Sequence, residues 1–308
     1  MQTYHHIADL AGIDAPLALA MGVFDGVHLG HRAVIDSAIA DARKTGGQAM
    51  VVTFEPHPIR VLRPESAPRL LASLQHKEIL LERLGLDGLV VVPFDRIFAE
   101  LPPGQFVGRL VESCRNLSSI SVGADWRFGA GRAGNAELLT QLGSEHGYQT
   151  FAIDAVSHGS DPISSTRIRA AIDCGDLDEA KALLGRDYTV LGTVVAGKQL
   201  GRTIGVPTAN LRVQSEQLPP DGVYAVRCLH GERIIDGVAN LGVRPTIQND
   251  AHTRQLEVHL LDFDEEIYGD TLEVTFVQFL RGEKKFDGIN ALKAQIAEDI
   301  EAARGAIN

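Results

Sequence analysis

The chain has 308 residues, enough for two domains of ordinary size, and its 44% hydrophobic and 22% charged residues are typical of a folded globular protein. A formal net charge of −11 argues against a general nucleic-acid-binding protein, but it leaves nucleotides open because a small anion needs only local donors. Cys114, Cys174 and Cys228 are widely separated, and no signal-peptide or membrane-span pattern is visible. We therefore expect a cytoplasmic protein with free thiols and no membrane or nucleic-acid partner.

The first half of the chain alternates short apolar runs with helical patterns. Runs typical of strands buried on both faces lie at residues 17–24, 49–54, 88–92, 118–122 and 148–153. Apolar spacing predicts helices at residues 31–44, 76–84 and 136–146. This order predicts a mostly parallel sheet with helices on both faces.

The second half follows a different pattern. Two short helical segments, residues 165–172 and 177–184, precede a region in which strands follow one another without helices. The predicted strands are residues 190–195, 223–229, 234–239, 256–261 and 272–279. They indicate an antiparallel barrel or sandwich, closed by a helix whose apolar stripe is Ile289, Leu292, Ile296 and Ile300. We place the boundary near residue 185, which gives domains 1–185 and 186–308.

The segment GVFDGVHLGH, residues 22–31, lies where a predicted strand ends and a helix begins. Ligands bind at such points in open α/β sheets, and the helix N-terminus adds N–H donors for a phosphate. His28 and His31, three residues apart, can both donate to the same phosphate. The candidate substrate-binding residues of the segment are Gly22, Phe24, Asp25, Gly26 and Gly30.

Two further segments support phosphate chemistry in this half. His57 stands between two prolines at the end of the next predicted strand. Ser164, Ser165, Thr166 and Arg167 begin a predicted helix, where hydroxyls and a guanidinium can clamp a phosphate. Each segment alone also fits a helix cap or a structural histidine. Their common position at strand ends favours a nucleotide site.

A glycine-rich segment in the second half indicates a second phosphate site. Its candidate residues are Gly197, Lys198, Gly201, Gly205, Pro207, Thr208 and Asn210. The segment is not the usual phosphate loop, because Gln199 follows Gly197-Lys198 where Ser or Thr would be needed. Thr208 and Asn210 offer two oxygens of the kind that Mg²⁺ shares with substrate phosphates.

A later strand carries the candidate general base. In residues 255–263 the apolar positions alternate with Glu257 and His259, which therefore share the opposite face. Alone, this pattern equally fits a solvated strand face. The histidines His76, His146, His158, His230 and His252 are expected to be ordinary surface or cap residues.

Together these motifs resemble the bacterial bifunctional riboflavin kinase/FMN adenylyltransferase family. Residues 22–31 are similar to its His-x-Gly-His signature, residues 163–169 to its Ser/Thr-rich partner motif, and residues 122–129, with Asp125, to a segment near its adenylylation site. In the second half, PTAN at 207–210, GVANLGVRPT at 237–246 and EVHLLDF at 257–263 resemble riboflavin kinase motifs in order.

The resemblance implies a Rossmann-like nucleotidyltransferase domain followed by a six-stranded Greek-key barrel with a terminal helix. It implies that riboflavin is phosphorylated to FMN and that FMN is adenylylated to FAD, with ATP as co-substrate and Mg²⁺ as cofactor. His28 and His31 would act on the ATP phosphates, His57 and Asp125 would position the nucleotide, Thr208 and Asn210 would hold Mg-ATP, and Glu257 would be the base.

Other readings stay open at this point. The chain could be a nucleotidyltransferase with one activity, or a flavin-binding regulatory protein with one or both sites inactive. The retained His, Arg, Asn and Glu side chains count against a pure sensor, which needs no base. Both a monomer and a weak homo-oligomer are compatible with the sequence.

Overall fold

The computed structural model describes residues 1–197, 201, 205–215, 217–243 and 254–307. The chain divides into two compact units. One comprises Met1–Arg69 with Leu74–Ser165, and the other comprises Leu70–Ser73 with Thr166–Asn308. The fold class predicted from the sequence is confirmed: the first unit contains a parallel sheet, and the second a closed antiparallel barrel followed by a helix.

The structural division falls upstream of the boundary expected near residue 185. Helices α7 (Ser165–Cys174) and α8 (Leu177–Leu184) group with the barrel. Tyr188 explains part of this grouping, because its hydroxyl donates to Gln217 O at 2.7 Å and to Leu71 O at 3.4 Å. Gln217 in turn donates from Nε2 to Asp173 Oδ1 at 2.9 Å, which ties α7 to the segment before β11.

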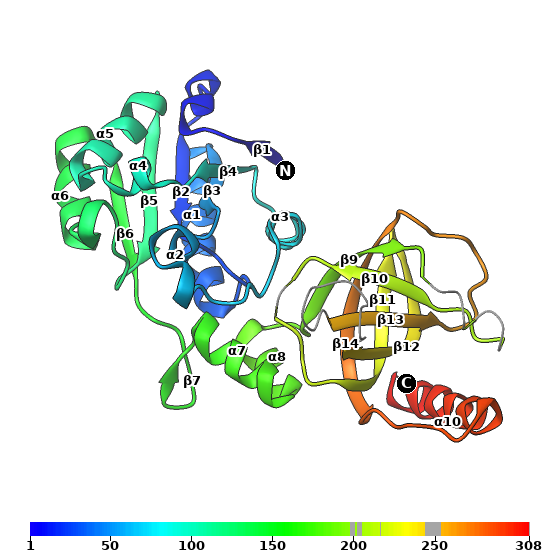
Figure 1. Ribbon diagram of the computed structural model, residues 1–308. Helices are drawn as coiled ribbons and strands as arrows, with labels where there is room; N and C mark the ends of the chain where they lie inside the picture. The colour runs from blue at the N-terminus through cyan, green and yellow to red at the C-terminus, as the bar shows by residue number, and fades with distance from the viewer. Residues whose placement is uncertain (198–200, 202–204, 216, 244–253, 308) are drawn as a thin grey trace. The chain divides into compact units, whose positions relative to one another are not determined.

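The N-terminal unit is built on a six-stranded sheet of order β1-β4-β3-β2-β5-β6, in which every pairing is parallel (Figure 1). Its strands are β1 (Gln2–Tyr4), β2 (Leu17–Met21), β3 (Gln48–Glu55), β4 (Gly88–Pro93), β5 (Leu117–Gly123) and β6 (Gln149–Ile153). Its helices are α1 (Leu29–Thr45), α2 (Pro58–Leu62), α3 (Leu74–Glu82), α4 (Arg96–Ala99), α5 (Pro103–Ser113) and α6 (Ala136–His146), with 3-10 turns η1 (Ile7–Gly12), η2 (Pro64–Ser66) and η3 (Ala130–Arg132). A short ribbon, β7 (Ser157–His158) with β8 (Asp161–Pro162), precedes α7.

Residue size on β2 explains how helices cover both faces of the sheet. Leu17, Leu19 and Met21 point to one face, where they join a core cluster with Phe106 and Leu110 of α5. The alternate positions are alanines, and α1 packs across β2, β3 and β5. Small side chains on that face let the helix lie close to the sheet.

The structure adds to the sequence-based expectations at the N-terminus and departs from them in α3. Residues 1–12, which carry no interpretable pattern, form β1 and η1, and β1 pairs with β4 at the sheet edge. The expectation that His76 is a surface or cap residue is wrong, because His76 in α3 is only 1% exposed. The next residue, Lys77, is also buried.

The C-terminal unit contains a closed barrel of order β10-β13-β12-β11-β14-β9. Its strands are β9 (Thr189–Val195), β10 (Ala209–Val213), β11 (Gly222–His230), β12 (Arg233–Val243), β13 (Arg254–Leu260) and β14 (Thr271–Arg281). Every pairing is antiparallel, so the six-stranded barrel implied by the family resemblance is confirmed. β10 is the strand that sequence pattern alone did not indicate.

The terminal helix α10 (Ile289–Ile307) packs on β11, β12 and β14. Of its expected apolar stripe, Ile289 is 56% exposed and the other three residues are half-buried, whereas the buried positions are Asp299, Ala303 and Ile307. Asp299, on the packed face, is buried and paired with Arg281 of β14 through two hydrogen bonds of 2.8 and 2.7 Å. Among the described residues, no helix is both long and apolar enough to span a bilayer.

Candidate active sites

The candidate nucleotide residues of the first unit gather where its strand order reverses. From β2 the chain moves to β3 on one side, and it later returns to β5 on the other side. The carboxyl ends of two such strands flank the position at which open α/β sheets bind ligands. Residues 22–28 follow β2, Asp125 follows β5, and His57 follows β3, the neighbour of β2.

His28 and His31 are held against each other at the start of α1. Their rings stack with centroids 3.5 Å apart and an interplanar angle of 17°. His28 is the N-cap residue of α1, and its Nδ1 accepts the His31 backbone N–H at 3.2 Å. Because Nδ1 is an acceptor, the proton of a neutral His28 lies on Nε2. The pair therefore presents an imidazole donor at a helix N-terminus.

Gly30 and Phe24 explain the spacing of this motif. A Cβ at Gly30 would lie 3.1 Å from His28 Cε1 and 3.2 Å from His28 Nδ1, so a larger residue would press on the imidazole. Phe24 is buried and meets the His31 ring edge-on at 5.3 Å. It adopts a φ of 51°, and Gly26 a φ of 83°. Gly22 also leaves room for Phe24, whose Cζ would lie 3.1 Å from a Cβ there.

Three other predicted residues lie near this loop or its sheet edge. Ser165 Oγ donates to Asp25 O at 2.9 Å, which joins the start of α7 to the loop. His57 is 8% exposed and caps α2, where its Nδ1 accepts from Ile59 N at 3.2 Å. Asp125 is exposed beyond the end of β5. The bonds made by His57 and Ser165 are structural, so their roles toward nucleotide remain predictions.

The remaining members of the Ser/Thr-rich motif divide between the units. Ser164 precedes α7 and belongs to the first unit, whereas Thr166 and Arg167 belong to the second. Arg167 Nη2 donates to Glu179 Oε1 of α8 at 2.5 Å. A phosphate role for Arg167 therefore stays a prediction.

In the barrel, strand register brings the predicted kinase residues together. Asn210 of β10 lies opposite Glu257 of β13, which in turn lies opposite Asn240 of β12. Residues paired in this way project from the same face, with Cβ atoms about 4.5–5.5 Å apart. Leu256, Val258 and Leu260 are buried, so the alternation predicted for this strand is confirmed. Thr208 lies two residues before Asn210 and is half-buried.

Close neighbours fix the Asn210 amide. Its Oδ1 accepts from Gln255 Nε2 at 2.9 Å, and Asn210 is 6% exposed. A Cβ at Gly197 would overlap the same amide, so a larger residue there would push Asn210 out of place. On the neighbouring side, His259 Nδ1 lies 2.7 Å from Pro207 O.

The rest of the glycine-rich segment is described only in part. A Cβ at Gly201 would overlap Val206 O and approach Thr208 Oγ1 at 3.3 Å, while Gly205 has a φ of 83°. Gly201 therefore lets the chain approach Val206 and Thr208 closely, and Gly205 adopts a backbone conformation that favours glycine. Lys198, predicted to cover the phosphates, lies outside the described residues, as do Arg244-Pro-Thr246 of the GVANLGVRPT motif.

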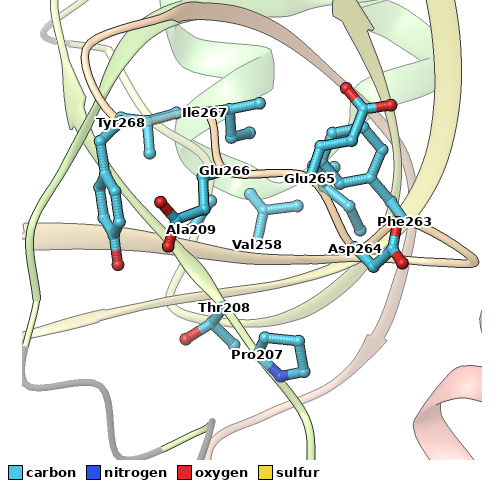
Figure 2. Close-up of a pocket in the computed structure, with 12 residues that line it drawn as sticks. Pro207, Thr208, Ala209, Val258, Phe263, Asp264, Glu265, Glu266, Ile267 and Tyr268 are labelled. Atoms are coloured by element: carbon cyan, nitrogen blue, oxygen red, sulfur yellow. The ribbon is translucent and has the colours of Figure 1, made fainter.

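A cavity of about 490 Å³ opens beside Pro207 and Thr208 (Figure 2). Its apolar lining includes the barrel residues Val194, Ala209, Val258 and Leu260, together with Phe263, Ile267 and Tyr268. Asp264, Glu265 and Glu266 contribute carboxylates. Such an apolar pocket with a few polar groups at one side is typical of small-ligand sites. Apart from Phe263, which belongs to the EVHLLDF motif, the residues of this wall were not identified from the sequence.

Ionic contacts brace the loop that forms this wall. Arg233 of β12 makes two hydrogen bonds to Glu265, of 2.7 and 2.8 Å, and its guanidinium lies 5.5 Å from the centre of the Phe263 ring. The hydrogen bond from Arg233 lowers the pKa of Glu265. His230 Nε2 lies 2.8 Å from Asp270 Oδ2 at the far end of the loop. The loop is thus tied at two points to the β11–β12 hairpin.

The barrel residues fit a magnesium ion that is shared with a nucleotide. Within the described ranges, no cluster of three or more His, Cys, Asp or Glu side chains could hold a metal alone. Thr208 and Asn210 offer neutral oxygens of the hard type that Mg²⁺ accepts when phosphates and water complete its shell. The Gln255 bond orients the Asn210 oxygen.

Comparisons with known proteins find two family regions in this chain. The family model described as FAD synthetase matches residues 11–167, and the one described as riboflavin kinase matches residues 184–307. Bifunctional riboflavin kinase/FMN adenylyltransferases are 41% identical in Escherichia coli K12 (93% of this chain and 91% of that protein) and 39% identical in Listeria monocytogenes (98% and 96%).

A solved structure from Streptococcus pneumoniae, described as a macrolide-efflux protein, is also similar. It is 32% identical, with a TM-score of 0.83 over 98% of each chain. The two family models match most of each unit, and the curated relatives align along nearly the whole chain. The chain belongs to the bifunctional riboflavin kinase/FMN adenylyltransferase family.

Proposed function

We propose that this chain makes FAD from riboflavin in two ATP-dependent steps, phosphorylation in residues 186–308 and adenylylation in residues 1–185. The observation that carries the proposal is the presence of two separate phosphate-type constellations in one chain. These are the stacked His28–His31 pair at the start of α1 and the Asn210–Glu257 pair in register on the barrel. Each falls within one of the two matching family models.

In the adenylylation step, an oxygen of the FMN phosphate attacks the α-phosphorus of ATP. A new O–P bond forms, the bond to the β-phosphate bridge breaks, and pyrophosphate leaves. No covalent enzyme intermediate is required, so the protein contributes positioning and charge neutralisation. His28, with its proton on Nε2, and His31 donate to the phosphates, and the N-terminus of α1 adds its dipole.

In the kinase step, Glu257 accepts the proton of the ribityl hydroxyl as that oxygen attacks the γ-phosphorus, and ADP leaves. Thr208 and Asn210 would hold Mg²⁺, which would neutralise part of the phosphate charge. Gly197 and Gly201 let the loop approach the phosphates closely.

The cavity beside Thr208 supports a position for the ATP base. Its apolar floor and the rings of Phe263 and Tyr268 suit a planar aromatic group (Figure 2). The carboxylates of the cavity repel phosphates. ATP therefore binds with its base in the cavity and its phosphates at Thr208 and Asn210. A cytoplasmic location and a monomer or weak homo-oligomer remain predictions.

Two rival functions have different consequences. A single-activity transferase would need only one constellation, and a regulatory flavin-binding protein would need no base.

Reciprocal inactivation tests the proposal. We expect His28→Asn, which keeps a side chain able to cap α1, to abolish FAD formation from FMN while FMN formation from riboflavin continues. Glu257→Gln should abolish FMN formation while supplied FMN still becomes FAD. Loss of both activities in a folded variant would contradict two independent sites.

A further inference from the structure

Lys77 is a buried cation beneath the nucleotide loop of the first unit. It lies on α3, a helix that carries none of the family motifs identified in the sequence, and it is 5% exposed. Burying a lysine is costly unless its ammonium finds partners. Its Nζ donates to Val23 O at 2.8 Å and lies 3.4 Å from Thr53 Oγ1.

Lys77 and Thr53 both donate to one peptide of the loop. Thr53, on β3 and fully buried, also donates to Val23 O, at 2.9 Å. The carbonyl of Val23 therefore accepts from two side chains that reach it from different elements. The next residue, Phe24, has a φ of 51°, so the chain turns sharply just after this anchored carbonyl.

The anchor determines which way the loop presents its donors. In a trans peptide the C=O and N–H point in opposite directions. Since Val23 O points toward Lys77, the Phe24 N–H points away from it. The same turn places Phe24 against His31, at 5.3 Å between ring centroids.

The charge of Lys77 also affects how the loop binds an anion. Burial lowers its pKa, whereas the charges of Asp25 and Glu55 raise it. These two carboxylates, on the loop and on β3, are the charged groups that act on the ammonium. The Lys77 ammonium offsets part of the negative charge of these two carboxylates, which would otherwise repel an anion bound on the loop.

From this geometry we propose that Lys77 is a positioning residue for adenylyl transfer, which fixes the Val23–Phe24 peptide and so prepares the loop to bind the phosphates of ATP. The inference rests on the proposed function of the first unit. It makes Lys77 a determinant of ATP affinity at this site and not of kinase activity in the barrel.

Lys77→Met tests the role, because methionine keeps an unbranched side chain but loses the donor and the charge. Supplied with FMN, the variant should show a KM for ATP raised about tenfold or more, the scale of a lost charged hydrogen bond. Lys77→Arg should recover most of this loss. Thr53→Val, which removes the second donor to Val23 O, should raise KM in the same direction but less. Riboflavin phosphorylation by each variant serves as the internal control.

A purely structural role would lower the fraction of active protein, which reduces kcat and leaves KM unchanged. An unchanged KM for ATP in Lys77→Met would therefore overturn the inference while leaving the proposed function intact. If Lys77→Met does not fold, an unchanged KM for ATP in Thr53→Val would overturn it equally. Wild-type protein that makes no FAD from FMN would overturn the proposed function and this inference together.

Discussion

Replacing Gly30 by alanine isolates the geometry of the histidine pair. The added methyl would lie 3.1 Å from His28 Cε1 and 3.2 Å from Nδ1, closer than ordinary contact. The His28 ring has little room to yield, because it stacks on His31 at 3.5 Å and accepts the His31 N–H. Alanine itself favours the helix by up to about 1 kcal/mol over glycine, so loss of the fold is not expected.

The expected effect is on catalysis. A misplacement of about 1 Å can cost on the order of 100-fold in rate, or about 2.7 kcal/mol. The His28 ring must give by a few tenths of an ångström, so we expect FAD formation from supplied FMN to fall in Gly30→Ala by up to about that factor. Riboflavin phosphorylation by the same preparation should be unchanged. Flavins separated by chromatography report both activities.

Gly108→Ala is a matched control. Gly108 lies inside α5 in the same unit, and no atom lies within 4 Å of a Cβ built there. This variant should retain both activities and unfold at an equal or higher temperature. Full FAD formation by Gly30→Ala, or an equal loss in Gly108→Ala, would refute the argument that Gly30 positions His28.

Three other predictions follow from single contacts. Gln255→Leu removes the donor to Asn210 Oδ1 and should lower the riboflavin kinase kcat/KM by about tenfold or more, because Gln255 orients this proposed metal ligand. FMN adenylylation should be retained, and unchanged kinase activity would refute the orienting role. Burial raises the pKa of both Cys114 and Cys228 to about 12, so at pH 8 iodoacetamide should modify only exposed Cys174, and mass spectrometry of the native protein would detect any exception. Arg281→Met removes the cation paired with buried Asp299 and should cost about 3–5 kcal/mol in the free energy of unfolding. The loss should appear as a lower denaturation midpoint of the barrel unit, and no change would mean that the ion pair is dispensable.

Strong periodic patterns made much of the fold predictable from the sequence. The helix α1 ends at Gly46 in a left-handed conformation, α6 begins after the Asn135 cap, and β13 buries alternate residues. These features depend on neighbours in the chain. Family resemblance added the sixth barrel strand, β10, which is short and follows directly on the Thr208 loop.

Features that depend on distant neighbours could not be predicted. Strand β1 has three residues and exists by pairing with β4. Helix α5 is hard to recognise because it begins after Pro102 and contains two glycines. The cavity wall around Phe263 lies in an acidic loop with a turn-like sequence, held by Arg233 from another hairpin.

Lys77 illustrates the same limit at the candidate nucleotide site. A lysine in a short helix with a weak apolar pattern is expected to be exposed, and the sequence gives no sign of its partners. Only the meeting of α3, β3 and the β2–α1 loop buries it against Val23 O. The motif residues themselves were recognisable because their chemistry is concentrated in one short segment.

The central claim is that one chain performs two sequential reactions. Incubation of the purified protein with riboflavin, ATP and MgCl₂, with flavins separated over time, tests it most directly. The account predicts that FMN appears first and FAD second, and that neither forms when Mg²⁺ is chelated. FMN that accumulates without FAD, or an absence of both products while riboflavin remains bound, would contradict it.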